Sequence, residues 1–123
     1  MIVLGVFLLG GLGVLVRFGL DSWWASSPST DFPMSTFLAN IIGCALAALI
    51  SILGVKQLIS VPVQTALLVG FCGGLTTFSA YTIQTASLFE NHRWSLATLY
   101  LFLSPAVGLI TISFVFWMTR RLF

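Results

Sequence analysis

The sequence predicts an all-α integral membrane protein with four membrane-spanning helices. Hydrophobic residues make up 59% of the 123 residues and charged residues only 7%, whereas soluble domains carry about 25% charged residues. The mean hydropathy is +1.10. A soluble protein this small has a large surface for its volume, and so few charges cannot cover it. High hydrophobicity also excludes a disordered chain. We therefore expect one membrane domain over residues 1–123.

The charged residues set the limits of the four predicted spans. They leave uncharged stretches at 1–16, 32–55, 57–89 and 94–119. A helix needs about 20 apolar residues to cross a bilayer. The first stretch reaches that length if Arg17 snorkels toward the headgroups, and no positive charge precedes it as in a signal peptide. The predicted spans are about 2–21, 34–55, 62–90 and 95–119.

The third span is too long for one straight helix and carries a polar interruption. Gly73 and Gly74 lie in mid-span, and Thr76 and Thr77 follow. Each mid-helix glycine costs about 1 kcal/mol relative to alanine, and hydroxyls can satisfy the backbone groups that a break exposes. This pattern predicts a helix broken at membrane depth, a feature that builds ion sites in transporters. The alternative is that the glycines only permit close packing.

The distribution of positive charge specifies orientation weakly. Four spans would place Lys56, Arg120 and Arg121 on one side of the membrane, and Arg93 with nearby Arg17 on the other. Cytoplasmic loops usually carry a clear excess of such charges. A chain with so little bias can insert both ways, and two oppositely inserted copies can then pair antiparallel. The alternative is a small protein that simply has few loops.

A small set of polar and aromatic residues inside the spans carries the functional information. Asn40 lies in the middle of the second span, where a buried amide needs partners, and an interhelical hydrogen bond is its ordinary explanation. Phe78 and Tyr81 share a helix face, and an aromatic edge can face an anion or simply pack in a core. Tyr100 and Ser104, four residues apart, form a partly polar stripe, although such serines often bond to their own helix.

Several classes of function are excluded because the sequence lacks the residues that they need. No carboxylate lies deep in a predicted span, and the sequence shows no metal-ligand cluster and no nucleophile–base pair. His92 stands alone in a predicted loop. We therefore expect no enzyme activity, and the net charge of +2 without a basic run predicts no nucleic-acid partner. Neutral donors and aromatic edges can hold an anion weakly enough to release it, as conduction requires.

Three motifs, in this order, resemble the Fluc/CrcB family of fluoride channels. They are Gly10-x-x-Gly13-x-x-x-Arg17, Thr36-Phe37-Leu38-Ala39-Asn40-x-x-Gly43 and Gly70-x-x-Gly73-Gly74-Leu75-Thr76-Thr77-Phe78-Ser79. The resemblance extends over essentially the whole chain, including its length and its four spans. The third motif is long and specific, which makes chance agreement of all three improbable.

The resemblance implies an antiparallel, dual-topology homodimer in the inner (plasma) membrane. Such a dimer exports fluoride passively through two pores and protects the cell from fluoride. The implied roles are a vestibule cation for Arg17 and backbone ligands of a central structural Na⁺ for Gly73 and Thr76. The implied fluoride pore comprises Asn40, Phe78, Ser79, Tyr81, Tyr100 and Ser104.

Three departures from the family pattern need a structural explanation. Tyr81 stands where the family has a second pore phenylalanine, so its hydroxyl could add a donor or occlude the path. Gln84 stands where many members have glutamate. Gly108 replaces a hydroxyl residue that is common in the polar stripe of the fourth span.

Two other functions remain open at this stage. A small dual-topology, proton-coupled exporter has a similar size but needs a membrane-embedded glutamate in the first span, and this chain has none. A non-transporting assembly subunit would tolerate the loss of the Asn40 side chain. Electrogenic flux that is uncoupled from protons distinguishes a channel from both.

Overall fold

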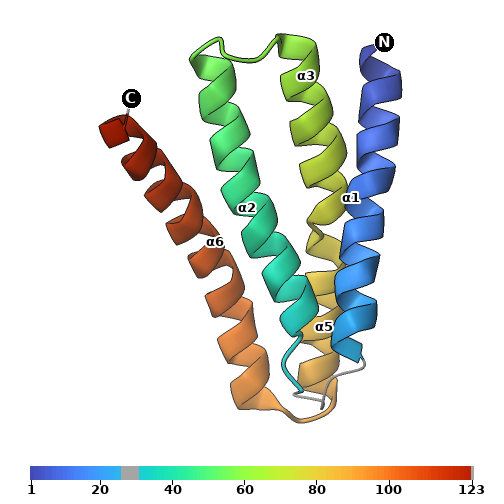
Figure 1. Ribbon diagram of the computed structural model, residues 1–123. Coiled ribbons are helices and arrows are strands. Elements are labelled where there is room, and N and C mark those ends of the chain that lie inside the picture. Colours follow the sequence, from blue (N-terminus) through green and yellow to red (C-terminus); the bar gives the residue numbers. More distant parts are fainter. Residues whose placement is uncertain (26–30, 123) are drawn as a thin grey trace.

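The computed structural model describes residues 1–25 and 31–122, and its described elements are all helical. Figure 1 shows the helices side by side, with the N-terminus and the α2–α3 loop at the same end. Four stretches, 2–25, 34–55, 61–90 and 94–121, are long and apolar enough to cross a membrane. The elements are α1 (Ile2–Ala25), α2 (Met34–Val55), α3 (Val61–Thr65), η1 (Ala66–Cys72), α4 (Gly73–Leu75), α5 (Phe78–Glu90) and α6 (Trp94–Leu122).

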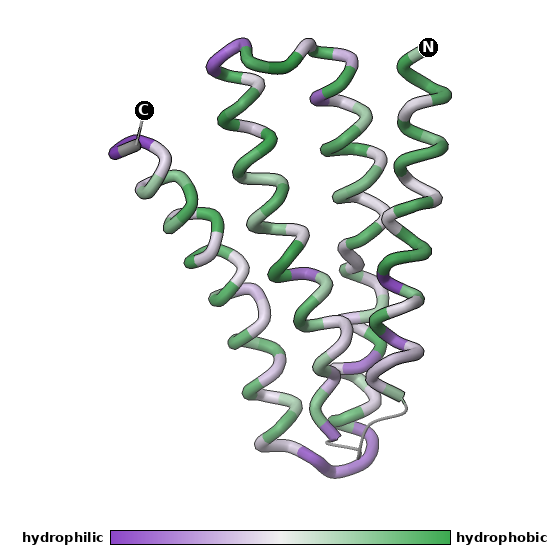
Figure 2. Tube along the Cα trace, viewed as in Figure 1, coloured by the Kyte–Doolittle hydropathy of each residue, from purple (hydrophilic) through white to green (hydrophobic). Residues whose placement is uncertain are grey.

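The all-helical, four-span fold predicted from the sequence is confirmed. Hydrophilic segments gather mainly at the loops and the C-terminal end, and the lengths between them are mostly hydrophobic (Figure 2). The first helix continues to Ala25, beyond the predicted limit of 21, and the last continues to Leu122. Charged side chains near a helix end do not stop the backbone from remaining helical, because they can extend toward the headgroups.

The third span is a broken helix, as predicted, and the break lies at Thr76–Thr77. Both residues have extended backbone, with ψ of 154° and 118°. The segment before the break includes η1, a stretch of wide π-helical turns. The glycine pair itself stays helical, because Gly73 and Gly74 form the short helix α4. The break therefore follows the glycines, at the two threonines.

The close-packing explanation of the glycines holds on one side of this span. Gly10 of α1 faces Gly70 and Gly74, and Gly13 faces the backbone of Phe71 and Leu75; we call Gly10, Gly13, Gly70 and Gly74 the glycine seam. A methyl group added at Gly13 would overlap the carbonyl of Phe71, and one added at Gly74 would overlap the carbonyl of Gly10. The backbones of α1 and the third span can approach this closely only because no side chain lies between them.

The opposite side of the third span faces α2 and α6. Helix α2 packs along α6, and α5 also packs against α6. Figure 1 shows α6 diverging from α2 toward its C-terminal end. The cavity described below lies on this side.

The loops after α2 and α5 reverse the chain with the same pattern of backbone hydrogen bonds. Gln57 and His92 have positive φ values of 56° and 57°. After α2, the N–H of Leu58 donates to Leu53 O at 2.9 Å, and after α5 the N–H of Arg93 donates to Leu88 O at 2.9 Å. These are Schellman motifs, which satisfy the last carbonyls of a helix.

An ion pair joins two segments at the other end of the bundle. Arg93, which immediately precedes α6, pairs with Asp31, which precedes α2. Both side chains are about half exposed, at 52% and 54%. An exposed pair of this kind contributes at most about 1 kcal/mol, so it aligns two neighbouring loops more than it stabilises the fold.

Candidate functional site

A cavity of about 600 Å³ opens beside the helix break. Its wall combines residues of α2, η1, α4, α5 and α6, so that segments far apart in the sequence meet there. Most of the wall is apolar, with a few polar groups among hydrocarbon side chains. Binding sites for small ligands commonly have this composition. The lining residues that carry the chemistry are Asn40, Gly73, Thr76, Thr77, Phe78, Tyr81 and Ser104.

Asn40 holds the broken segment of the third span in place. Its side-chain oxygen accepts a hydrogen bond from the Thr77 N–H at 2.8 Å, and its Nδ2 donates to the Thr77 carbonyl at 3.3 Å. One side chain thus forms hydrogen bonds with both backbone polar groups of a residue that has left the helix. An amide nitrogen carries two hydrogens, so one donor of Asn40 is still available for a ligand in the cavity.

The break frees backbone carbonyls of their usual partners, among them those of Gly73 and Thr76. In a continuous helix the N–H of residue i+4 donates to each carbonyl. The Thr77 N–H, due to Gly73 O, donates to Asn40 instead. The Ala80 N–H, due to Thr76 O, donates to the Thr77 side chain at 3.2 Å and so caps α5. The carbonyls of Gly73 and Thr76 therefore lose their helical donors together.

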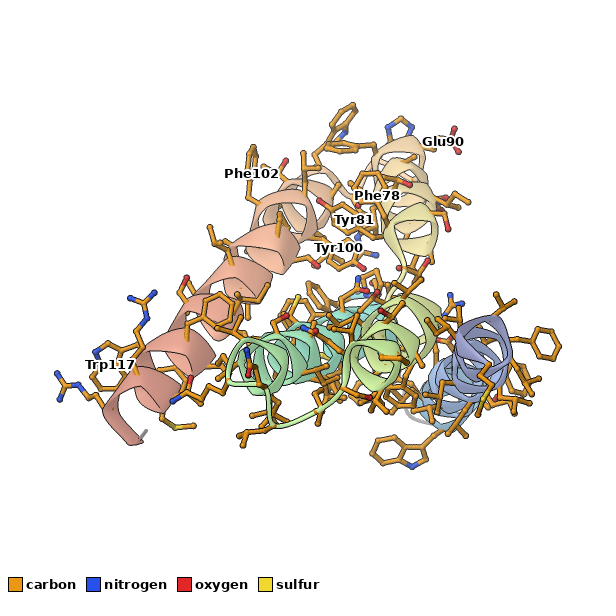
Figure 3. The ribbon with its side chains drawn as sticks, turned by 90° about the horizontal axis from the view of Figure 1, so that it is seen from above. Phe78, Tyr81, Glu90, Tyr100, Phe102 and Trp117 are labelled. Atoms are coloured by element: carbon orange, nitrogen blue, oxygen red, sulfur yellow. The ribbon has the colours of Figure 1, made fainter. Side chains whose placement is uncertain are left out.

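An aromatic row borders the cavity between α5 and α6. Figure 3 shows Phe78, Tyr81 and Tyr100 gathered in this region, whereas Phe102 and Trp117 point away from it. Phe78 is 77% exposed and Tyr81 only 8% exposed. Their ring centroids are 5.8 Å apart, and the rings of Tyr81 and Tyr100 lie 5.2 Å apart in an edge arrangement. Such spacing is typical of attractive aromatic pairs.

The hydroxyl of Tyr81 is already used within the protein. It donates to the carbonyl of Leu101, with an O···O distance of 2.6 Å. The cavity therefore meets the Tyr81 ring and not a free phenolic donor. This geometry answers the question raised by the tyrosine at this position: it adds an internal hydrogen bond between α5 and α6.

Gln84 links three helices through its side-chain amide. Its oxygen accepts a hydrogen bond from the Tyr100 hydroxyl at 3.1 Å, and its nitrogen donates to the Thr36 hydroxyl at 2.9 Å. Tyr100 and Thr36 are almost completely buried, with exposed fractions of 0% and 1%. Buried polar groups need such partners. Gln84 therefore connects α2, α5 and α6 behind the aromatic row.

Gly108 has a steric explanation on the opposite wall of the cavity. A methyl group at this position would lie 3.3 Å from Cys44 Sγ, which is tighter than ordinary van der Waals contact. A larger hydroxyl residue would crowd that cysteine. The absence of a side chain at Gly108 and the presence of Cys44 are thus matched.

The structure brings six of the predicted site residues to one cavity and leaves three outside its lining. Tyr100 lies behind Tyr81, and the Ser79 hydroxyl lies 3.2 Å from the Thr77 hydroxyl. Arg17 lies on α1, and its buried Nε has no hydrogen-bond partner among the described residues. The role of each residue in transport stays a prediction. The six are Asn40, Gly73, Thr76, Phe78, Tyr81 and Ser104.

Sequence reasoning missed the part that Thr77 plays. The hydroxyls after the glycines were expected to serve the break collectively, whereas Thr77 both pairs with Asn40 and caps α5. The signal was an asparagine in one span and a threonine pair in another. Their pairing could not be inferred, because the two residues are 37 positions apart in the chain.

The fold and the cavity define the class of this protein: a small multi-pass membrane protein with a polar cavity beside a helix broken at mid-span. Comparison with known families narrows this class. Residues 4–116 match the family model described as CrcB-like protein, Camphor Resistance (CrcB). The chain belongs to this family.

Relatives with assigned names come from diverse bacteria. A protein of Mycolicibacterium paratuberculosis named fluoride-specific ion channel FluC 1 is 37% identical over 94% of this chain and 88% of its own length. A FluC 2 of Listeria monocytogenes is 35% identical, covering 96% of this chain and 88% of the relative. A FluC 2 of Streptococcus pneumoniae is 40% identical, covering 91% and 90%. All three are named as fluoride-specific ion channels.

Proposed function

We propose that this chain forms a fluoride-selective channel that lets the ion leave the cell passively and so protects the cell from fluoride. The observation that carries the proposal is the cavity at the helix break, where Asn40, Phe78 and Ser104 meet. The names of relatives that are 35–40% identical over most of the chain support it.

The cavity offers the kinds of groups that a small anion needs. Fluoride is strongly hydrated, so several oriented donors must replace its water. The second amide hydrogen of Asn40, the Ser104 hydroxyl and the ring edges of Phe78 and Tyr81 are such groups. All are neutral. A fixed positive charge would hold the ion more tightly and slow its release.

We further propose that the working unit is an antiparallel homodimer in the inner (plasma) membrane. Phe78 and Gly73 line the cavity yet are exposed in the single chain. A second copy would close the cavity and shield these residues. The weak charge bias between the two ends of the bundle favours copies inserted in both directions.

A structural Na⁺ at the dimer centre is part of the same proposal. The carbonyls of Gly73 and Thr76 fit this hard cation, because both have lost their helical donors and both residues line the cavity. Unwound backbone carbonyls bind Na⁺ in transporters with broken helices. Bound there, the ion would offset the negative end of α4 and supply positive potential to the cavity. Replacing Na⁺ by a large organic cation should destabilise the dimer in detergent.

Fluoride efflux from proteoliposomes tests the proposed function. The purified chain is reconstituted with internal potassium fluoride, and a potassium ionophore is added to relieve charge build-up. A channel gives fast fluoride efflux that requires the ionophore, with no matching efflux of chloride. Efflux driven by a proton gradient without the ionophore would indicate a coupled exporter. No efflux from a folded dimer would contradict the proposal.

A further inference from the structure

Pro105 leaves one backbone carbonyl of α6 without its helical hydrogen-bond donor. Pro105 lies inside α6, which runs from Trp94 to Leu122. Proline has no backbone N–H, so it cannot donate to the carbonyl four residues earlier. That carbonyl belongs to Leu101. In a membrane span an unsatisfied carbonyl costs several kcal/mol, because lipid offers no replacement donor.

The missing donor comes from another helix. The Tyr81 hydroxyl on α5 donates to Leu101 O at 2.6 Å, at the short end of the range for O–H···O bonds. Tyr81 is 8% exposed, so water does not compete freely for this bond. The Tyr81 side chain on α5 thus supplies the hydrogen-bond donor to Leu101 O that Pro105 removes from α6.

The same bond holds the Tyr81 ring in place. The ring lies between Phe78 and Tyr100, with centroid distances of 5.8 Å and 5.2 Å. A phenylalanine could keep these aromatic contacts but could rotate and shift, whereas the hydroxyl fixes the far end of the ring to the backbone of α6. The position of the ring in the cavity wall is thereby set.

We propose that Tyr81 is a positioning residue whose hydroxyl replaces the backbone donor removed by Pro105 and thereby fixes the aromatic ring that lines the cavity. The first half of this proposal concerns folding alone. The second half rests on the proposed function, since it assigns the fixed ring to the anion path. In this chain the tyrosine at the second aromatic position and the proline are a functional pair.

A double-mutant cycle tests the first half. The variants Tyr81→Phe, Pro105→Ala and their combination are purified in detergent, and their Tm values are compared. Tyr81→Phe alone should lower Tm by roughly 5 °C, because Leu101 O loses its donor. Pro105→Ala restores a backbone N–H, so the same substitution in that background should change Tm by no more than about 1 °C.

Tyr100→Phe provides the matched control. It also removes a tyrosine hydroxyl from the aromatic row, but its partner is Gln84 and not the proline-linked carbonyl. Tyr100→Phe should lower Tm by the same amount in the unmutated chain and in the Pro105→Ala background. Equal losses for Tyr81→Phe in the two backgrounds would overturn the pairing. If Tyr81→Phe alone yields no folded protein, recovery of folded protein in the Pro105→Ala background supports the pairing and no recovery contradicts it.

Fluoride efflux separates positioning from a purely structural role. The double variant has a satisfied Leu101 carbonyl but an untethered ring. It should fold like Pro105→Ala and conduct fluoride several-fold more slowly than Pro105→Ala. Equal rates would show that the hydroxyl serves only the helix and would overturn the positioning role. If the unmutated chain conducts no fluoride, the proposed function fails, whereas the cycle in Tm still decides the pairing.

Discussion

The two sides of the third span are built on opposite principles. Toward α1, the glycine seam brings two backbones together with no side chains between them. Toward α2 and α6, side-chain hydrogen bonds from Asn40, Tyr81 and Gln84 connect helices around a cavity. The first side gains its stability from close packing and the second from satisfied polar groups. The contrast shows how one span can be anchored firmly and still present a polar, open face.

The largest effect is expected from filling the glycine seam. Gly13→Leu should prevent folding, because even a methyl group at this position would overlap the Phe71 carbonyl, and a backbone atom cannot move aside as the end of a flexible side chain can. Gly11→Leu is the matched control on the same helix, since nothing lies within 4 Å of an added methyl there. The yield of monodisperse protein in size-exclusion chromatography measures both. Equal yields would show that the seam is not the anchor.

A smaller but still large loss is expected on the polar side, from Asn40→Ala. The variant leaves the Thr77 N–H without its partner, at about 1–3 kcal/mol for a buried group, and removes one of the donors to the Thr77 carbonyl. Fluoride efflux should fall sharply, and Tm should fall too.

Ser51→Ala is the control for Asn40→Ala. The Ser51 hydroxyl, also on α2, donates to the Ala47 carbonyl of its own helix, so its removal should change Tm little. If Ser51→Ala lowered Tm as much as Asn40→Ala, the hydrogen bonds between Asn40 and Thr77 would stabilise the fold no more than a bond within one helix does.

An intermediate effect on stability is expected from substitutions of Gln84. Two side chains of similar size, one apolar and one hydrogen-bonding, separate the effect of shape from that of hydrogen bonding. Gln84→Leu should lower stability by about 1–3 kcal/mol, because the buried hydroxyls of Tyr100 and Thr36 lose their partner. Gln84→Glu keeps an acceptor for Tyr100, and the Thr36 hydroxyl can turn to donate. Thermal unfolding should rank the glutamate variant above the leucine variant. The reverse order would remove Gln84 from the polar side of the comparison.

The smallest effect is expected in the loops, which belong to neither side. His92→Gly should raise stability by less than about 1 kcal/mol, because glycine adopts the observed φ of 57° without strain but loses more entropy on folding. Tm should rise slightly, with fluoride efflux unchanged. A change in efflux would show that the loop influences the cavity.

The sequence was sufficient for the four spans and for the existence of a broken third helix. Few charges and long apolar stretches determine where helices can cross lipid, and these are local properties. The exact site of the break was not predictable in the same way. Glycine propensity pointed to Gly73 and Gly74, but the seam keeps Gly74 helical against α1, and Asn40 stabilises the extended Thr77.

The bonding of the cavity residues was also beyond the sequence. Pro105 was recognisable as a disturbance in its helix, and Tyr81 as a departure from the family pattern. Linking the two requires knowing that Tyr81 on α5 faces Leu101 on α6. Tyr100 was predicted to line the pore, which stays a prediction; the sequence did not reveal that its hydroxyl donates to Gln84 or that the residue is completely buried in the single chain. Which hydrogen-bond partner such a side chain finds depends on how the helices are rotated relative to one another in the folded protein.

The glycine seam also has a consequence for the order of assembly during synthesis. Helix α1 is made first, yet it packs mainly against η1 and α4, which follow α2 along the chain. Spans insert as separate helices before they associate. Before Leu75 has left the ribosome, helix α1 can therefore form only its smaller contacts, those with α2 and α3. A nascent chain that ends before Ala66 lacks the surface against which α1 packs most extensively.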